Sequence, residues 1–286
     1  MNKARFIFLL FLFQFSIGYS QRSALNTAIE ALKKDKALQH ATWSVCVMNT
    51  KKDTAIAEYN SGISVIPAST LKIVTTGAAL AILGSDFVFE TQLLYDGSLD
   101  TVSGILKGNL YIKGGGDPTL GSEYFIDKKD SLTVIEKWAV ILKAKGIKKI
   151  EGAIIGDASI FDDNMVPSQW IWSDMGNYFG AGASGLTYHD NKYTILYKSG
   201  AAGTATSINK IVPQIPGMQL INTVTAGGND DNAFIYGSSY SNYRLASGTI
   251  PSNKNNYEVE GSIPDPALFC AQELERALKN VDVTIT

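Results

Sequence analysis

The chain has 286 residues, a formal net charge of −2, 45% hydrophobic residues and 18% charged residues. The apolar fraction is too high for a disordered chain, and the slightly acidic balance offers no electrostatic basis for binding nucleic acid. Two cysteines and two histidines exclude a disulfide scaffold and leave little for a Cys-based or His-rich metal centre, so we expect no metal and no cofactor.

The first twenty residues have the pattern of a secretory signal peptide. Lys3 and Arg5 precede an apolar run over residues 6–17, and small residues follow up to Ser20. A membrane anchor is the alternative, but the run is shorter than the roughly 20 residues that a spanning helix needs. We therefore expect cleavage near Gln21 and a periplasmic or secreted bacterial protein with no transmembrane span after cleavage.

A helix, a hairpin and a second helix are predicted next. Apolar residues repeat at helical spacing between Leu25 and Leu32, and residues 43–48 and 54–59 are strand-like runs around a polar turn. A mostly apolar stretch over residues 73–83 ends at Gly84. This pattern predicts a buried helix that stops at a glycine.

From about residue 87 the chain becomes rich in short β-type runs, separated by Gly, Asn, Asp and Ser. The clearest runs are residues 87–95, 104–112, 150–155 and 193–197, with more up to residue 259. One helix interrupts them, and Thr133 and Glu136 fit its capping box. The last helix begins at Asp265 and Pro266, a favourable N-cap followed by proline, and a strand-like end follows.

The two cysteines lie in different patterns. Cys46 falls in a strand-like run and Cys270 in the last helix. A disulfide between them can form in an oxidising compartment, but two buried thiols are the simpler expectation.

The strongest candidate for chemistry is Ser69-Thr70-Leu71-Lys72. Serine and lysine three residues apart on a helix lie on the same face. A serine hydroxyl needs an adjacent base, and a lysine can serve when burial or a nearby cation lowers its pKa. We expect the apolar helix to supply that burial and its N-terminus to favour an oxyanion. The same S-x-x-K spacing at residues 207–210 lies in a polar segment without a helix pattern, and we expect no site there.

Five segments carry a resemblance to a known family. They are P-A-S-T-L-K at 67–72, G-N-L-Y-I-K-G-G-G-D-P-T-L at 108–120, G-D-A-S-I-F at 156–161, G-N-Y-F-G-A-G-A-S-G-L at 176–186 and P-D-P-A-L-F at 264–269. In this order they resemble the penicillin-binding serine–lysine acyltransferases, and among them the D-alanyl-D-alanine carboxypeptidases of peptidase family S13, the penicillin-binding-protein-4 type. The resemblance covers essentially the whole mature chain.

The resemblance implies an α/β (α+β) fold, a serine–lysine transpeptidase-like domain of the β-lactamase and penicillin-binding class, interrupted by β-rich inserted domains. We expect a signal peptide over residues 1–20, the first part of this domain over 21–90 and the insertion over 91–262. Residues 263–286 would return to the transpeptidase-like domain, which would then be incomplete.

The resemblance also implies a serine-type D-Ala-D-Ala carboxypeptidase that acts on peptidoglycan stem peptides, with endopeptidase activity in some members. Ser69 would be the acylated nucleophile, and Lys72 would take its proton. Asp157 aligns with an acidic residue that in some members contacts the free amino group of the stem peptide, although an Asp after Gly is often only a turn residue. β-Lactam antibiotics would be covalent inhibitors.

Serine–lysine enzymes complete their site with S-x-N and K-[TS]-G elements. Lys198-Ser199-Gly200 and Ser207-Ile208-Asn209 have these forms, but in reversed order and inside the segment that resembles the insertion. We expect both to be chance matches and the true elements to lie beyond Thr286. One oxyanion donor normally comes from the third element, and losing a donor costs roughly 10²–10³ in rate, so we expect the chain alone to be inactive or nearly so.

Two other functions compete with this hypothesis. A catalytically silent module could hold stem peptides or a partner through the β-rich insertion. A serine β-lactamase fits less well, because the long insertion does not belong to that family. Trp170 and Trp172 could stack on a sugar, although core or interface packing is the more common role of such a pair.

Overall fold

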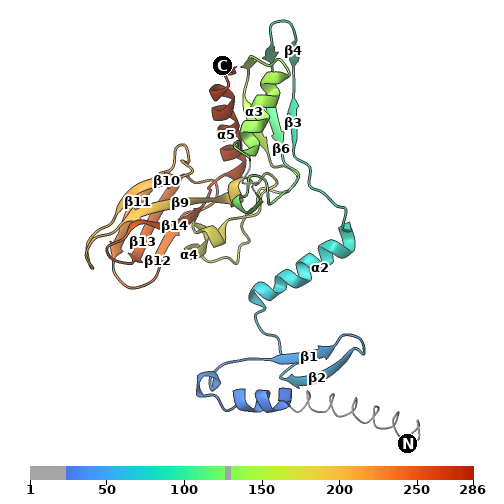
Figure 1. Ribbon diagram of the computed structural model, residues 1–286, viewed down its shortest axis with the longest axis vertical. Coiled ribbons are helices and arrows are strands. Elements are labelled where there is room, and N and C mark those ends of the chain that lie inside the picture. Colours follow the sequence, from blue (N-terminus) through green and yellow to red (C-terminus); the bar gives the residue numbers. More distant parts are fainter. Residues whose placement is uncertain (1–23, 126–129) are drawn as a thin grey trace, which may run out of the picture. The chain divides into compact units, whose positions relative to one another are not determined.

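The computed structural model describes residues 24–125 and 130–286 and divides the chain after Phe87 into two units (Figure 1). Unit 1 ends at Phe87 and unit 2 comprises Val88–Thr286; each is described by itself. The signal peptide predicted over residues 1–20 lies outside the described residues. Within the described ranges, no helix combines the length and apolar character needed to cross a membrane.

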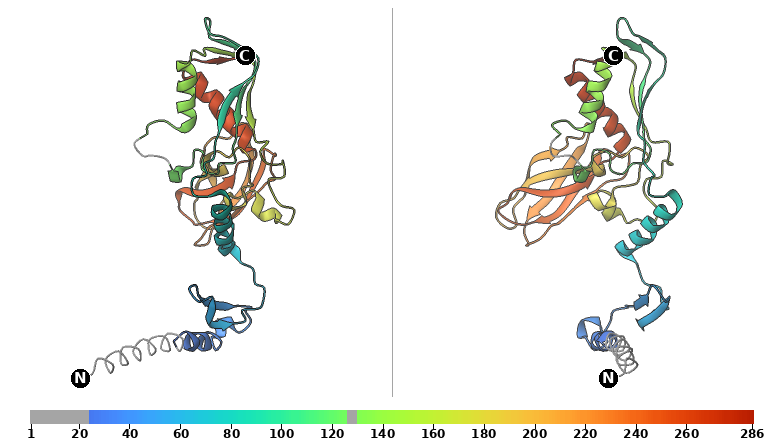
Figure 2. Two further views of the ribbon diagram at one scale, coloured as in Figure 1. Left: turned by 90° about the vertical axis from the view of Figure 1, so that its right-hand side faces the viewer. Right: turned by 45° about the vertical axis from the view of Figure 1, so that its right-hand side comes forward.

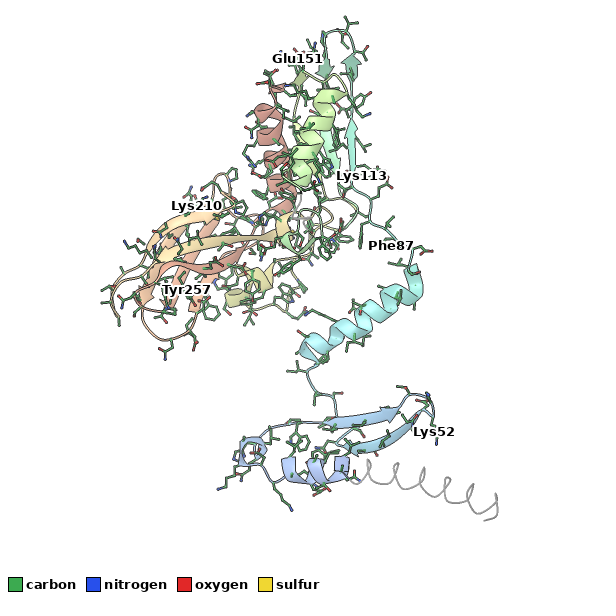
Figure 3. The ribbon with its side chains drawn as sticks, in the orientation of Figure 1. Lys52, Phe87, Lys113, Glu151, Lys210 and Tyr257 are labelled. Carbon is green, nitrogen blue, oxygen red and sulfur yellow. The ribbon has the colours of Figure 1, made fainter. Side chains whose placement is uncertain are left out.

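Unit 1 begins with helical residues 24–32, where Ile29 is buried, and with the 3-10 helix η1 (Lys36–Leu38). Strands β1 (Val45–Asn49) and β2 (Thr54–Tyr59) form the predicted antiparallel hairpin. In its turn, the side chain of Asn49 accepts hydrogen bonds from the backbone N–H groups of Lys51 and Lys52, both at 3.0 Å (Figure 3). A short polar side chain thus closes the turn, as such residues commonly do.

The predicted helix after the hairpin is present but not buried. The 3-10 helix η2 (Ala68–Thr70) leads into α2 (Leu71–Leu83), and Gly84 ends α2 at φ 83°, a conformation that favours glycine. The expectation of burial is wrong for this structure, because no residue of α2 is buried and Ile82 is 80% exposed. The apolar residues surround the helix rather than forming one stripe, so no single face marks where it packs.

The described part of unit 2 contains four sheets. The first has the order β3 (Gln92–Tyr95), β6 (Leu110–Lys113), β8 (Ile154–Asp157), and the second the order β15 (Thr284–Ile285), β7 (Lys149–Glu151), β5 (Ile105–Lys107), β4 (Ser98–Asp100). The third has the order β10 (Ser207–Val212), β9 (Lys192–Lys198), β14 (Asn255–Ser262), and the fourth the order β11 (Gln219–Ala226), β13 (Tyr243–Ile250), β12 (Asn232–Tyr236). The α-helices of this part are α3 (Val134–Ala144), α4 (Trp172–Met175) and α5 (Pro266–Asn280), and its 3-10 helices are η3 (Glu123–Phe125), η4 (Tyr178–Gly180) and η5 (His189–Asn191).

Two of the predicted strand runs are each broken once, and the breaks face each other. Strand β5 pairs in parallel with β7, and β6 continues with the same register beside β8. At the break, a Cβ on Gly152 would lie 2.3 Å from the carbonyl oxygen of Gly108, so the two backbones need glycine there. The prediction of unbroken strands over 104–112 and 150–155 is therefore corrected to two kinked strands that feed two sheets.

The two longer helices of unit 2 begin as predicted. Thr133 Oγ1 accepts from the Glu136 N–H at 3.2 Å, and the Glu136 carboxylate accepts from the Thr133 N–H at 2.8 Å, so the capping box is complete. Asp265 caps α5 by accepting from the Leu268 N–H at 2.9 Å. Figure 2 shows α3, in green, beside α5, in red, in agreement with the contacts between them.

Residues 263–286 pack inside unit 2. Helix α5 contacts α3 and β8 and buries Phe269, Leu274 and Leu278, and β15 pairs with β7. Their assignment to a transpeptidase-like domain stays a prediction.

Both cysteines are free thiols. Cys270 lies fully buried in α5, as expected, but Cys46 is exposed. The expectation that Cys46 is buried is wrong for this structure because burial alternates along β1 and Cys46 falls on the solvent side of the hairpin.

Candidate active site

Ser69 and Lys72 lie at the start of α2, where their functional groups meet. Ser69 is in η2, and Lys72 is in the first turn of α2. The Lys72 Nζ donates a hydrogen bond to the Ser69 Oγ at 3.1 Å. This separation is within the reach expected of a nucleophile and its base. The structure therefore brings together the two residues that the sequence singled out.

The backbone just before the serine has an uncommon conformation. Ala68 has a φ of 45°, in the left-handed region that a non-glycine residue rarely adopts. The backbone N–H and the hydroxyl of Thr70 both donate to the carbonyl oxygen of Pro67, which closes this turn. Such a conformation costs about 1–3 kcal/mol and often lies beside a functional residue. Alanine is not a typical left-handed residue, so no local pattern indicated it.

The local environment of Lys72 differs from the expectation. We expected the apolar helix to bury this lysine, but Lys72 is exposed, as are the following apolar residues Ile73 and Val74. A helix buries a side chain only when another surface covers it, and its own apolar neighbours do not suffice. The desolvation that favours a neutral lysine would have to come from a substrate or a protein surface that covers this face of α2.

The two short motif matches in unit 2 have structural roles. The buried Ser199 hydroxyl donates to the Pro251 carbonyl oxygen at 2.6 Å and accepts from the Lys254 N–H at 2.9 Å. The Asn209 side chain donates to the side-chain oxygens of Asn255 and Asn256. Ser199 directly follows β9 and is tied to the segment that precedes β14, whereas Asn209 lies in β10 and is tied to β14 itself.

The second S-x-x-K match lies in the β10-β9-β14 sheet. Ser207 and Lys210 are in strand β10 rather than in a helix (Figure 3). A register shift between Ile208 and Lys210 leaves both side chains on the exposed face of β10, but a strand lacks the helix N-terminus that favours an oxyanion. The expectation that this match is no catalytic site agrees with its secondary structure.

Asp157 ends strand β8 in unit 2. Its carboxylate accepts a hydrogen bond from the Ser159 N–H at 2.9 Å. Hydrogen bonds from the hydroxyl and backbone of Ser159, and the charge of Lys113, its register partner on β6 (Figure 3), hold the pKa of Asp157 below its usual value. Asp157 is therefore ionised at neutral pH, whether or not it also serves as a turn residue.

Asp157 lines a cavity of about 580 Å³, which we call the acidic cavity. Asp163 and Asp265 line it as well, together with Tyr111 and Tyr240. Burial and the nearby carboxylates of Asp163 and Asp265 raise the pKa of Tyr240, so its hydroxyl stays protonated. A cavity with three carboxylates favours a cationic group such as an ammonium. The sequence indicated Asp157 alone, because the other residues come from distant segments.

Ser69 and Lys72 belong to unit 1, and Asp157 belongs to unit 2. The structure thus describes a nucleophile–lysine pair in one unit and an acidic cavity in the other. Among the described residues, no cluster of three or more His, Cys, Asp or Glu side chains could hold a metal ion.

The sequence matches a known family over nearly all of the described chain. The model of the D-Ala-D-Ala carboxypeptidase 3 (S13) family matches residues 25–286. The chain is 30% identical to the D-alanyl-D-alanine carboxypeptidase DacB of Haemophilus influenzae over 181 residues, which are 63% of this chain and 35% of that protein. It is 26% identical to a D-alanyl-D-alanine carboxypeptidase of an Actinomadura species over 275 residues, which are 91% of this chain and 48% of that protein.

Solved structures show the same fold. The chain superimposes on penicillin binding protein 4 (dacB) from Haemophilus influenzae with a TM-score of 0.65 and 25% identity, covering 83% of this chain and 51% of that chain. A second structure of that protein, in complex with a novel β-lactam, gives a TM-score of 0.63 at 22% identity, covering 90% of this chain and 52% of that chain. This confirms the predicted fold class.

The chain spans between about a third and about half of the length of the relatives it matches. The family model nevertheless extends from unit 1 through unit 2 to the last residue. The chain therefore belongs to the D-Ala-D-Ala carboxypeptidase 3 (S13) family.

Proposed function

We propose that the protein is a serine-type D-Ala-D-Ala carboxypeptidase that acts on peptidoglycan stem peptides through an acyl-enzyme intermediate. The observation that carries this proposal is the 3.1 Å hydrogen bond between Lys72 Nζ and Ser69 Oγ, in a chain that belongs to a carboxypeptidase family. No observation favours the silent binding module over this activity.

The proposed reaction has two steps. In the first step, neutral Lys72 takes the Ser69 hydroxyl proton while Oγ attacks the carbonyl carbon of the penultimate D-alanine. Lys72 passes this proton to the amide nitrogen as the peptide C–N bond breaks, so the terminal D-alanine leaves with a free amino group and the peptide remains esterified to Ser69. In the second step, a water molecule attacks this ester, which releases the shortened peptide and regenerates the serine hydroxyl.

β-Lactams would enter the same route. Attack of Oγ on the lactam carbonyl opens the ring, and the ring nitrogen takes the proton. Because the leaving group stays tethered to the acyl group, the ester hydrolyses slowly and the protein keeps an adduct. The structural match to penicillin binding protein 4 in complex with a novel β-lactam supports this proposal.

The acidic cavity suits the amino group of a stem peptide. Asp157 is ionised and lines the same cavity as two further carboxylates, so an ammonium group would be attracted there. We extend the proposal to Asp157 as a substrate-binding residue that contacts this amino group.

The proposed place of action is outside the cytoplasm, in the periplasm or the medium of a bacterium. The support is the signal-peptide pattern of the first twenty residues and the cell-wall substrate that the family implies.

Intact-mass measurement of the full-length protein after incubation with benzylpenicillin tests the proposal. We expect one adduct in the wild type, none in Ser69→Ala, and an unchanged adduct in Ser207→Ala, the serine of the second S-x-x-K match. An adduct that persists in Ser69→Ala would refute Ser69 as the nucleophile. No adduct in the folded wild type would support the binding module, and rapid consumption of the drug without a lasting adduct would support a β-lactamase.

A further inference from the structure

We propose that unit 2 carries a second ligand site, on the outer face of the β11-β13-β12 sheet, that binds an N-acetylated hexosamine unit of a glycan chain. The site is a cavity of about 460 Å³, which is in the size range of small-ligand sites. It lies where α4 contacts β12 (Figure 1). We call it the aromatic cavity, and it shares no lining residue with the acidic cavity.

The floor of the aromatic cavity is a row of side chains across the sheet. The strand register places Ile221 beside Leu245, and Leu245 beside Tyr236. Ser247 follows two residues after Leu245 and lies on the same face. Ile221 is 61% exposed and Leu245 39% exposed, so the floor is apolar and uncovered.

Two further aromatic rings border this floor. Trp172 comes from the start of α4, and Tyr243 from the start of β13. Trp172 is 54% exposed and Tyr243 is 66% exposed, although both line a hollow. Large exposed apolar groups gathered around a hollow mark binding sites. A flat aromatic face suits the C–H face of a pyranose ring, which is apolar, while the hydroxyls at the ring edge remain free to hydrogen-bond.

The polar groups of the aromatic cavity favour a neutral ligand. Ser238, Ser241 and Ser247 supply hydroxyls, and no carboxylate or lysine lines the cavity. Its one charged residue, Arg244, is only 2% exposed. A ligand with many hydroxyls and no net charge fits this lining, whereas a cationic ligand would prefer the acidic cavity.

Arg244 holds the loop between β12 and β13, which forms the rim of the aromatic cavity. Its Nη1 donates to the carbonyl oxygens of Ser238, Ser241 and Tyr243 at 3.2, 2.6 and 3.0 Å. A Cβ on Gly237 would lie 2.4 Å from this nitrogen, so glycine leaves room for the guanidinium. The guanidinium also interacts with the hydroxyl of Tyr193, which is fully buried in the core of unit 2. A rim held in advance reduces the ordering cost of binding.

The apolar floor of the aromatic cavity is the reason for proposing a sugar that carries an acetamido group. A plain sugar ring needs only a stacking face and hydrogen-bond partners, but the exposed Ile221 and Leu245 offer an additional apolar surface for a methyl group. An N-acetyl group supplies that methyl group together with a polar amide. That the glycan belongs to the cell wall rests on the proposed function, whereas the cavity and its chemistry do not.

Calorimetric titration of the full-length protein with the β1→4 tetramer of N-acetylglucosamine tests this site. Cellotetraose is the matched ligand, because it has the same linkage and lacks the acetamido groups. We expect the tetramer to bind and cellotetraose to bind at least tenfold more weakly. Trp172→Ala should weaken tetramer binding about tenfold, which corresponds to about 1.4 kcal/mol. Trp170→Ala, which replaces a 41% exposed tryptophan outside the lining, should change it less than twofold.

Four results would overturn the site: no tetramer binding by the folded wild type, equal binding of both tetramers, unchanged binding in Trp172→Ala, or an equal loss in Trp170→Ala. A sugar-free stem peptide that binds with the same dependence on Trp172 would identify a peptide site instead. Thermal unfolding of each variant checks that it is folded. Because the tetramer contains neither D-alanine nor a β-lactam, Ser69→Ala should bind it like the wild type. If the tetramer does not bind, the result for benzylpenicillin acylation of Ser69 still stands. If Ser69 is not acylated, the result for tetramer binding at the aromatic cavity still stands.

Discussion

The Nζ of Lys72 donates a hydrogen bond to the hydroxyl oxygen of Ser69 over 3.1 Å. To act as a base, the same nitrogen must accept the serine proton through a lone pair, which only a neutral amine has. The two atoms can then form the reverse bond, in which the serine hydroxyl donates to Nζ. Their separation therefore suits proton transfer from Ser69 to a neutral Lys72.

Replacing Lys72 with arginine tests this role. We expect Lys72→Arg to slow benzylpenicillin acylation about 10²–10⁴-fold, because a guanidinium stays protonated and cannot take the serine proton. The rate of adduct formation in the full-length protein is the measurement. Lys210→Arg, in the second S-x-x-K match, should leave the rate unchanged. Acylation of Lys72→Arg at the wild-type rate would show that Lys72 is not the base.

The left-handed backbone conformation of Ala68 leads to a second prediction. A β-branched residue is strongly disfavoured at a φ of 45°, so Ala68→Val should shift the turn and displace Ser69. We expect acylation to slow about tenfold or more, whereas Ala68→Gly, which adopts this φ freely, should keep at least half of the wild-type rate. Equal rates in the two variants would mean that this backbone conformation does not position the nucleophile.

Substrates with and without a free amino group test Asp157. We expect Asp157→Asn to weaken selection for the free amine by about 1.5–3 kcal/mol, the range for a hydrogen bond to a charged group. Benzylpenicillin acylation should change little. Since the pKa of Asp157 is below its usual value, the wild-type preference should persist as pH falls below about 4 and disappear only when the carboxylate is protonated.

The measurement is the ratio of kcat/KM for a peptide and its N-acetylated form. Asp163→Asn offers a control in the same cavity, whose effect should be the smaller of the two. A ratio that is unchanged in Asp157→Asn would remove this residue from substrate binding.

Lys192 holds two acidic side chains near the core of unit 2. It is 9% exposed, and its Nζ bonds Glu123 at 2.7 Å and Glu260 at 2.9 Å. Lys192→Met should lower the free energy of unfolding by about 1.5–3 kcal/mol, because both carboxylates lose a charged donor. Lys279→Met, at the exposed pair with Glu275, should cost less than about 1 kcal/mol. Urea unfolding measures both values.

The pH dependence of this cluster follows from Glu123. The hydrogen bond and the charge of Lys192 hold its pKa below the usual value. The stabilisation is therefore present above the unfolded pKa of about 4.3 and is lost as pH falls through the lower folded value. Between pH 5 and pH 3, unfolding free energies should fall more steeply for the wild type than for Lys192→Met. Parallel curves would show that the pair does not couple to folding.

The two thiols should differ in reactivity. Burial and the charge of Glu273 raise the pKa of Cys270 to about 12, so its reactive thiolate is scarce in the folded protein, whereas Cys46 is exposed. We expect a thiol reagent to label one cysteine of the native protein and the second only after unfolding. Cys46→Ser should abolish the native labelling. A protein with no free thiol after unfolding without reductant would instead contain the disulfide.

Local patterns predicted the ends of elements well. The capping box of Thr133 and Glu136, the N-cap at Asp265 and the stop at Gly84 are all present, because each depends on a few neighbouring residues. The motif at Ser69 and Lys72 was found for the same reason, since one helical turn fixes the spacing of the two side chains.

Features that depend on distant segments were missed. The exposure of α2 and of Cys46 is decided by what covers them, and the residues around Asp157 in the acidic cavity come from segments far apart in the chain. No local sequence pattern indicates that β11 pairs in parallel with β13. The row formed by Ile221 and Leu245 depends on this pairing, so it could not be predicted either.

Gly108 lies at the break between β5 and β6, and Gly152 lies at the facing break between β7 and β8. Because the strands pair in the same register on both sides of the breaks, the number of residues at one break must match the number at the other. Deleting one residue at the first break, such as Asn109, would slide β6 by one position along β8 while β5 and β7 stay in register. Ile112, which is fully buried, would then turn to the opposite face of its sheet. A second deletion beside Gly152 would restore the alignment. During evolution, insertions and deletions at these two places should therefore be tolerated only as matched pairs.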